Sequence, residues 1–196
     1  MSGKTDELVA AIDILWENFN YCKSHFPYMQ DEKEGAKNVK TAPNYVTQGA
    51  DISFEFPKGI SAEAITMNNE VDKWINENFI VRLCDILESY RIISKKIKVN
   101  FILDGAEEMS ITRRLRHALV YSSGIYNSED KGHCLTMELM KDKLGISIEG
   151  LTEWDLSVDT VLTPLYEGCR KYVIGLEELP ISERSAKKKH HANNLR

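Results

Sequence analysis

The spacing of hydrophobic residues predicts a chain made mostly of helices. Between Asp6 and about Phe26, apolar residues recur at alternating intervals of four and three, which is the period of one helix face. A second segment of this kind begins after Ser61, runs to about Ile93 and has the strongest periodicity in the sequence. Its expected buried face consists of Val71, Ile75, Phe79, Leu83, Ile86 and Tyr90. These two segments predict two long helices.

Two further helices are predicted in the second half of the chain. One runs from about Ala106 to Ser122 and carries apolar residues on one face. The other begins near Thr152, and Pro164 is expected to kink it or to lie near a break. Gly175 is expected to close the domain.

The segments between these helices predict less regular structure. Gln30 to Thr47 is polar and lacks periodicity, which is typical of a long loop. Apolar and polar residues alternate from Ile52 to Phe56, which indicates one short strand. The segment 133–150 fits both a helical and a strand pattern, and we favour a strand from Lys143 to Ile148.

Together these elements predict an all-α bundle of four or five helices with a small β element. We expect residues 1–178 to form a single domain. Residues 179–196 contain many lysines and histidines and few side chains that would be buried, which predicts a disordered basic tail.

Composition narrows the classes of protein that the chain can belong to. Hydrophobic residues make up 42% and charged residues 28% of its 196 residues, as in ordinary globular proteins. The net charge of -5 argues against wholesale binding of nucleic acid but leaves room for a local basic site. The sequence contains neither a run of about 20 apolar residues nor a secretory signal. We therefore expect a cytoplasmic protein with no membrane partner.

The cysteines and tryptophans predict structural roles. Cys22, Cys84, Cys134 and Cys169 are far apart, without the Cys/His spacing of a zinc site, so we expect reduced thiols and neither a metal nor another cofactor. His133, beside one of these cysteines, is expected to have a structural or surface role. Trp16, Trp74 and Trp154 lie at or beside apolar stripes, so we expect core or interface positions for them.

The stretch with the most chemistry is Arg116-His117-Ala118-Leu119-Val120-Tyr121, followed by Ser122-Ser123-Gly124. Side chains four residues apart share a helix face, so Arg113, His117 and Tyr121 are expected to form one polar stripe. A helix with such a stripe is suited to holding an anionic phosphate.

On these residues the chain resembles the HEPN superfamily of small helical bundles. Arg116 and His117 match the first two positions of its signature, and the segment from Ser122 to Tyr126 is similar to the continuation that is common in these proteins. Tyr121 departs from the pattern, because it stands where the family has its terminal histidine. The resemblance implies metal-independent endoribonuclease activity, a homodimer around the signature helix, and a role in toxin systems, antiviral defence or RNA processing.

The resemblance and the side-chain chemistry suggest a role for each candidate residue. We expect Arg116 to clamp a phosphate, His117 to transfer or orient a proton, and Tyr121 to donate a hydrogen bond. Arg113, Ser122 and Ser123 are the candidate substrate-binding residues. A phenol with a pKa of about 10 is a poor base at pH 7, so Tyr121 predicts weakened or lost hydrolysis.

Several functions remain open at this point. The chain is either an RNA-directed protein, as an active nuclease or as a degenerate RNA-binding relative, or a non-catalytic dimerising interaction module or antitoxin-like regulator with a protein partner. A structural alternative gives Arg113, Arg114 and Arg116 only ion pairs with carboxylates of Glu107, Glu108 or the second long helix.

Overall fold

The computed structural model confirms an all-α architecture with a small β element. It describes residues 2–30, 34–41, 52–94, 97–122, 124–147, 153–154 and 156–179. In chain order the elements are α1 (Ser2–His25), β1 (Ala36–Lys40), β2 (Ser53–Ile60), α2 (Ala62–Ser89), α3 (Ala106–Tyr121), α4 (Lys131–Leu144), the π-helical segment η2 (Val158–Leu162) and α5 (Thr163–Glu178).

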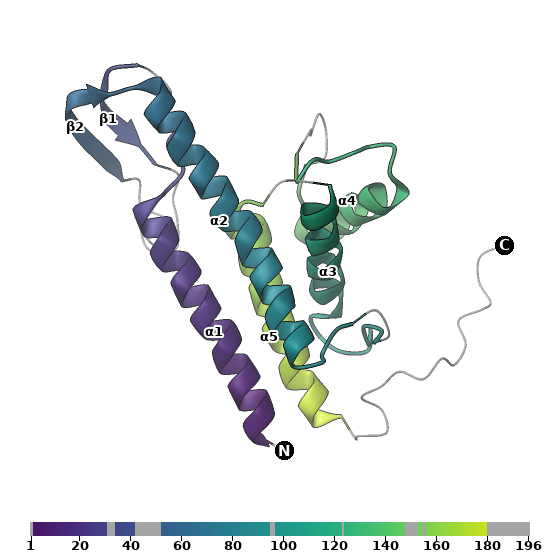
Figure 1. Cartoon of the computed structure of the whole chain (residues 1–196). Coiled ribbons are helices and arrows are strands. Elements are labelled where there is room, and N and C mark those ends of the chain that lie inside the picture. The colour runs from purple at the N-terminus through teal and green to yellow at the C-terminus, as the bar shows by residue number, and fades with distance from the viewer. Residues whose placement is uncertain are drawn as a thin grey trace.

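The long helices lie side by side and form the body of the molecule (Figure 1). α1 packs against α2 and α5, and the antiparallel pair β1 and β2 caps one end of this layer. α3 packs against α2 and α5 from the other side, and α4 crosses beyond it. Within the described helices, no stretch combines the length and the apolar character that crossing a lipid bilayer requires.

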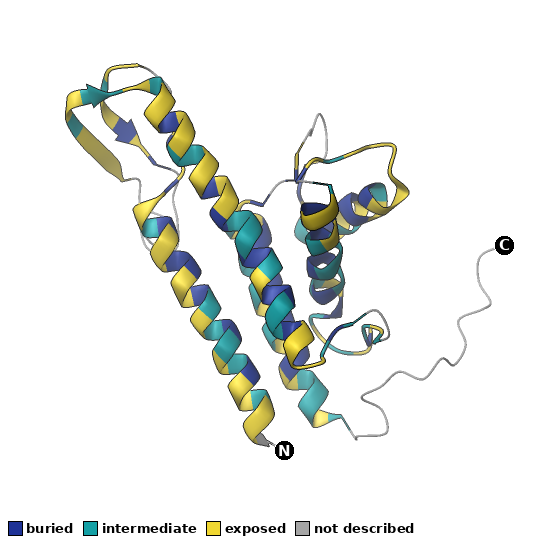
Figure 2. Ribbon diagram, in the orientation of Figure 1, coloured by how far each residue is buried: buried dark blue, intermediate teal, exposed yellow. Residues whose placement is uncertain are grey.

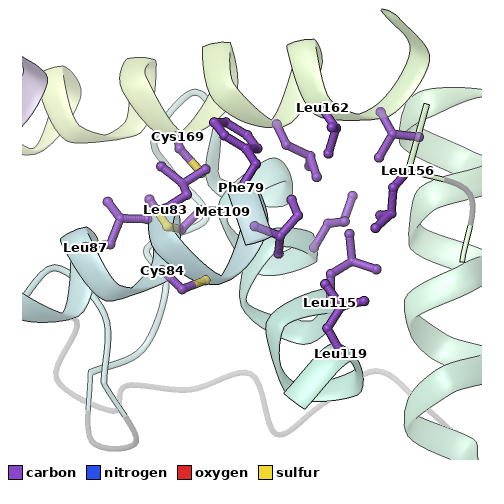
Figure 3. Close-up of a cluster of buried hydrophobic side chains, with 14 of the residues drawn as sticks. Phe79, Leu83, Cys84, Leu87, Met109, Leu115, Leu119, Leu156, Leu162 and Cys169 are labelled. Carbon is purple, nitrogen blue, oxygen red and sulfur yellow. The ribbon is translucent and has the colours of Figure 1, made fainter. Parts of the chain in front are cut away.

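The hydrophobic core lies where α2, α3 and α5 meet (Figure 3). Phe79 and Leu83 of α2 face Met109 and Leu115 of α3, and all four are almost completely buried. Figure 2 shows the same division along each helix, with buried positions turned inward and exposed ones outward. Burial of one such side chain stabilises the fold by about 1.5–3 kcal/mol, so this contact holds α3 in place.

α3 and α5 approach each other closely because glycines lie at their contact. Gly105, at the start of α3, has a φ of +81°, and a Cβ added there would lie 1.9 Å from the carbonyl oxygen of Gly168 in α5. A Cβ added at Gly168 would lie 2.4 Å from the Cβ of Glu108. Any side chain at these positions would push the two helices apart.

Helix α2 begins where the sequence predicts and exposes residues that were expected to be buried. The Ser61 side chain accepts a hydrogen bond from the amide of Ala64, which caps the first turn. Val71 and Tyr90 were predicted on the buried face, but both are exposed. Trp16 and Trp154 are buried as expected, whereas Trp74 lies on the surface.

Three predicted element boundaries are wrong. β1 lies within the predicted loop Gln30–Thr47, where it pairs with β2. The strand predicted from Lys143 to Ile148 is not formed at its start: α4 continues to Leu144, and Gly145 then adopts a left-handed conformation that ends the helix. The last helix was predicted to begin near Thr152, but helical structure begins at Val158 with η2 and continues through Gly175 to Glu178.

Other predictions fall outside the described residues. These are the basic tail from residue 180 onward, Ser123, and residues 148–152, which include part of the segment with two competing patterns.

Candidate functional site

The structure places the guanidinium of Arg116 between α3 and α2. Its Nη2 atom lies 3.6 Å from Oδ1 of Asp85 and 3.5 Å from Oε2 of Glu88, both on α2. Its Nε atom is buried and has no hydrogen-bond partner among the described residues. These are ion pairs with the second long helix, as the structural alternative predicts. The group expected to clamp phosphate is thus already faced by two carboxylates.

His117 and Tyr121 do come together, as their spacing predicts. Their ring centroids are 4.7 Å apart with an interplanar angle of 43°, and both side chains are exposed. Arg113 begins the same stripe, but its Nη1 donates a hydrogen bond to the carbonyl oxygen of Ile97, 3.2 Å away. The structure therefore forms a two-ring surface on α3, while the two guanidinium groups contact other parts of the chain.

Ser122 takes part in a hydrogen-bonded network around His133. Its Oγ lies 3.2 Å from Nε2 of His133, and Nδ1 of that ring accepts a hydrogen bond from the amide of Asn127 at 3.1 Å. The buried imidazole packs edge-on against Trp154, with ring centroids 5.1 Å apart. His133 therefore has a structural role: it fixes the turn between α3 and α4.

A cleft elsewhere on the molecule gathers more polar groups than the α3 stripe does. It has a volume of about 1000 Å³ and lies between α2, the residues after α1, and the segment from Glu153 to Thr160. Cavities of this size are typical of small-molecule sites. We call it the α2 cleft.

A buried ion pair between α1 and α2 contributes to the wall of the α2 cleft. The Lys23 ammonium donates a hydrogen bond to Oδ1 of Asp72, and both side chains are almost fully buried. Burial lowers the pKa of Lys23 and raises the pKa of Asp72, while the attraction between the two charges opposes both changes.

Further charges line the opening of the α2 cleft. Lys73 forms an exposed ion pair with Glu153, which ties α2 to the opposite wall. Burial raises the pKa of Glu77, and the nearby Lys73 ammonium opposes that shift. Raised carboxylate pKa values beside a cleft are a common property of binding and catalytic sites.

Two buried polar atoms of the α2 cleft residues lack hydrogen-bond partners in the described structure. They are Oδ1 of Asn76 and Nε1 of Trp154. Most buried polar groups in folded proteins are paired, so each of these atoms needs an explanation. Both atoms lie beneath the surface of the cleft and are not exposed to it.

Sequence reasoning missed the α2 cleft because its residues are far apart in the chain. One signal was present: Asp72 lies seven residues after Ile65 and seven before Phe79, at a helix position otherwise occupied by apolar side chains. A charged residue within an apolar stripe indicates a buried partner. Its partner, Lys23, lies on another helix and is not identified by spacing.

Neither a metal site nor similarity to a known protein indicates a function for the chain. Across the ranges that the structure describes, no three His, Cys, Asp or Glu side chains are placed to hold a metal ion. Comparison of the chain with protein-family models, curated proteins and solved structures finds no match.

Proposed function

We propose that the protein is a non-catalytic interaction module. The observation that carries the proposal is an apolar stripe on the outer face of α2, formed by Met67, Val71 and Trp74, which we call the α2 stripe. The spacing of four and three residues puts them on one helix face. Met67 and Trp74 are each 61% exposed and Val71 is 38% exposed. Exposed apolar side chains aligned on one helix face are typical of a protein-interaction site.

The residues around the α2 stripe support this interpretation. Glu70 and Lys73 are exposed on the same helix and flank the apolar side chains. An apolar centre with a charged rim is the usual anatomy of a protein interface, and tryptophan is among the residues that contribute most to binding energy.

The partner that we propose is a second copy of this chain. A two-fold axis brings the same patch of both copies together, so that an apolar stripe is complementary to itself. A homodimer was also expected from the HEPN resemblance, but that expectation placed the contact around α3. The proposed contact uses α2, because its exposed apolar residues follow one another along a single helix face.

The arrangement of the α3 residues supports binding rather than cleavage. Cutting RNA requires a free cation near the phosphorus and a group that moves a proton. Arg116 faces Asp85 and Glu88, and a tyrosine occupies the position of the expected histidine. Neither requirement is met by these two side chains.

Light scattering during gel filtration tests the proposed dimer. We expect the wild type to have a mass well above that of one chain at micromolar concentration, and Val71→Asp to return it to one chain. Ile174→Asp is the matched control, because Ile174 on α5 has the same 38% exposure. A wild type that is monomeric throughout, or a control as disruptive as Val71→Asp, would contradict the proposal.

An RNA-directed function is the second candidate, and the two-ring surface of α3 favours it. Exposed rings such as those of His117 and Tyr121 are surfaces on which unpaired bases stack. Under this candidate the protein binds single-stranded RNA without cleaving it, since Arg116 is already paired.

A gel with labelled single-stranded RNA in the presence of EDTA tests this candidate. We expect a shifted, intact band that Tyr121→Ala weakens. Phe101→Ala is the control, because the Phe101 side chain is 67% exposed, as is that of Tyr121. Cleaved RNA would favour the nuclease alternative instead, and an unshifted band would remove RNA as a partner.

A further inference from the structure

The loop between α2 and α3 presents two adjacent apolar side chains to solvent. Phe101 is 67% exposed and Ile102 is 87% exposed, the highest value among the large hydrophobic residues of the described chain. Both residues lie outside the α2 stripe and the α2 cleft, so they are independent of the proposed dimer. Neighbouring apolar side chains with so little cover indicate a surface that contacts something other than water.

The chain fixes this loop so that the two side chains stay exposed. They are the central residues of a turn, which is closed by a 3.2 Å hydrogen bond from the amide of Leu103 to the carbonyl oxygen of Asn100. The Asn100 side chain accepts a hydrogen bond from the amide of Ile102. The buried amide of Asn100 donates a hydrogen bond to the hydroxyl group of Tyr172 in α5. The exposure of Phe101 and Ile102 is therefore a property of the folded loop.

A basic segment of the chain begins close to this turn. Leu103 lies against α5, where a Cβ added at Gly175 would be 3.2 Å from its side chain. One turn further on, α5 ends at Glu178. The sequence from residue 180 to residue 196 contains five Lys or Arg residues and one Glu, and three of the lysines are consecutive. The basic tail is thus attached next to the apolar turn.

The charges of the loop itself are nearly balanced. Lys98 and Asp104 are both exposed and lie on either side of the turn. Attraction to an anionic surface therefore comes mainly from the tail, and the loop contributes mainly apolar contact. An apolar insertion combined with a polybasic segment is the pair of signals that gives stable attachment to a membrane surface.

We propose that the turn 100–103 and the basic tail together bind the surface of a bilayer that contains anionic lipid. Phe101 and Ile102 enter the boundary between headgroups and acyl chains, and the lysines of the tail contact the anionic headgroups. The expectation of no membrane partner relied on the lack of a spanning segment, which surface binding does not require. Ile102 favours lipid over RNA, because an aliphatic side chain has no ring on which a base can stack.

Flotation of the full chain with lipid vesicles tests the apolar contact. We expect the wild type to float with vesicles of phosphatidylserine and phosphatidylcholine, and Ile102→Asp to weaken this binding about tenfold or more. Ile14→Asp is the matched control and should bind like the wild type, because Ile14 on α1 is 56% exposed and lies outside the loop. A wild type that does not float, or an Ile102→Asp variant that binds as well as the control, would overturn the proposal.

Charge variants test the electrostatic part with the same vesicles. Replacing Lys187, Lys188 and Lys189 together by Gln should weaken binding more than tenfold, since each lysine near an anionic surface contributes about fivefold. Lys37→Gln should leave binding unchanged, because Lys37 is exposed on β1 at the other end of the helical layer (Figure 1). Equal binding to vesicles of phosphatidylcholine alone would contradict the requirement for anionic lipid.

Insertion of the turn can be separated from adsorption by charge alone. In a Phe101→Trp variant, lipids with brominated acyl chains should quench the added tryptophan fluorescence when vesicles bind, relative to the wild type. Bound protein whose added fluorescence is not quenched would show that the turn stays outside the acyl boundary, and would contradict the proposed contact.

Discussion

Lys23 of α1 and Asp72 of α2 form an ion pair with only 5% and 6% of their side-chain surfaces exposed. Each charge has lost its water, and each is compensated by the other. Because the two residues come from different helices, the pair fixes how α1 and α2 lie against each other.

Breaking this pair from one side should be costly. We expect Asp72→Leu to destabilise the fold by about 3–5 kcal/mol, because the Lys23 ammonium is left buried without a partner. The double variant Lys23→Met/Asp72→Leu should recover most of that loss, since it removes both charges. Urea unfolding of the three proteins measures the difference, and a double variant as unstable as the single one would argue against the pairing.

The carboxyl group of Glu77 should make stability depend on pH in a defined direction. Burial raises its pKa above the ordinary value of 4.5, so the folded protein holds this proton more tightly than the unfolded chain does. Glu77 therefore contributes stability at low pH, and that contribution is lost as the pH rises from about 4.5 through the raised pKa. Relative to Glu77→Gln, the wild type should lose stability over this interval. If the stabilities of the two proteins instead change in parallel with pH, folding does not raise the pKa of Glu77, and the expectation is contradicted.

The glycine contact between α3 and α5 predicts an unusual response to alanine. In a helix interior, alanine is ordinarily about 1 kcal/mol more favourable than glycine. We expect Gly168→Ala to destabilise by about 1–3 kcal/mol instead, because its Cβ would overlap Glu108. Gly3→Ala in α1 is the control, since nothing lies within 4 Å of its added Cβ. Thermal unfolding should move in opposite directions for the two variants, and a stabilised Gly168→Ala would contradict the close approach.

The four cysteines should divide into two reactive and two protected thiols. Cys22 is exposed and Cys134 is partly exposed, whereas Cys84 and Cys169 are buried. Burial raises the pKa of Cys84 and raises that of Cys169 to about 12, which leaves little thiolate at neutral pH. A thiol reagent should label two sites quickly in the folded protein and all four after unfolding. Rapid labelling of all four in the folded state would contradict the packing of the core.

The long helices were predictable because their apolar spacing extends over many turns, but the phase of α1 was not. Leu15 and Trp16 are adjacent apolar residues, so two overlapping stripes fit the sequence. The stripe through Leu15 leads to Cys22, whereas the structure buries Trp16 and Lys23 and exposes Cys22. Which of the two stripes is buried depends on the α2 residues that α1 packs against. The most important of these is Asp72, which forms the ion pair with Lys23.

The remaining differences also arise from contacts between distant segments. β1 has one buried residue, Val39, so its sequence lacks the alternation that would predict a strand without its partner β2. On α3 the sequence predicted the helix and the proximity of His117 to Tyr121. It did not determine that Arg116 would contact Asp85, because ion pairs between helices leave no spacing pattern.

The proposed dimer requires that the α2 stripe becomes covered in solution. Of the three tryptophans, Trp74 is exposed while Trp16 and Trp154 are buried, so iodide quenching of tryptophan fluorescence reports mainly on α2. If two copies associate through this stripe, the quenchable fraction should fall as protein concentration rises through the micromolar range, and Val71→Asp should abolish the change. A quenchable fraction that stays constant at every concentration would contradict the proposed interface.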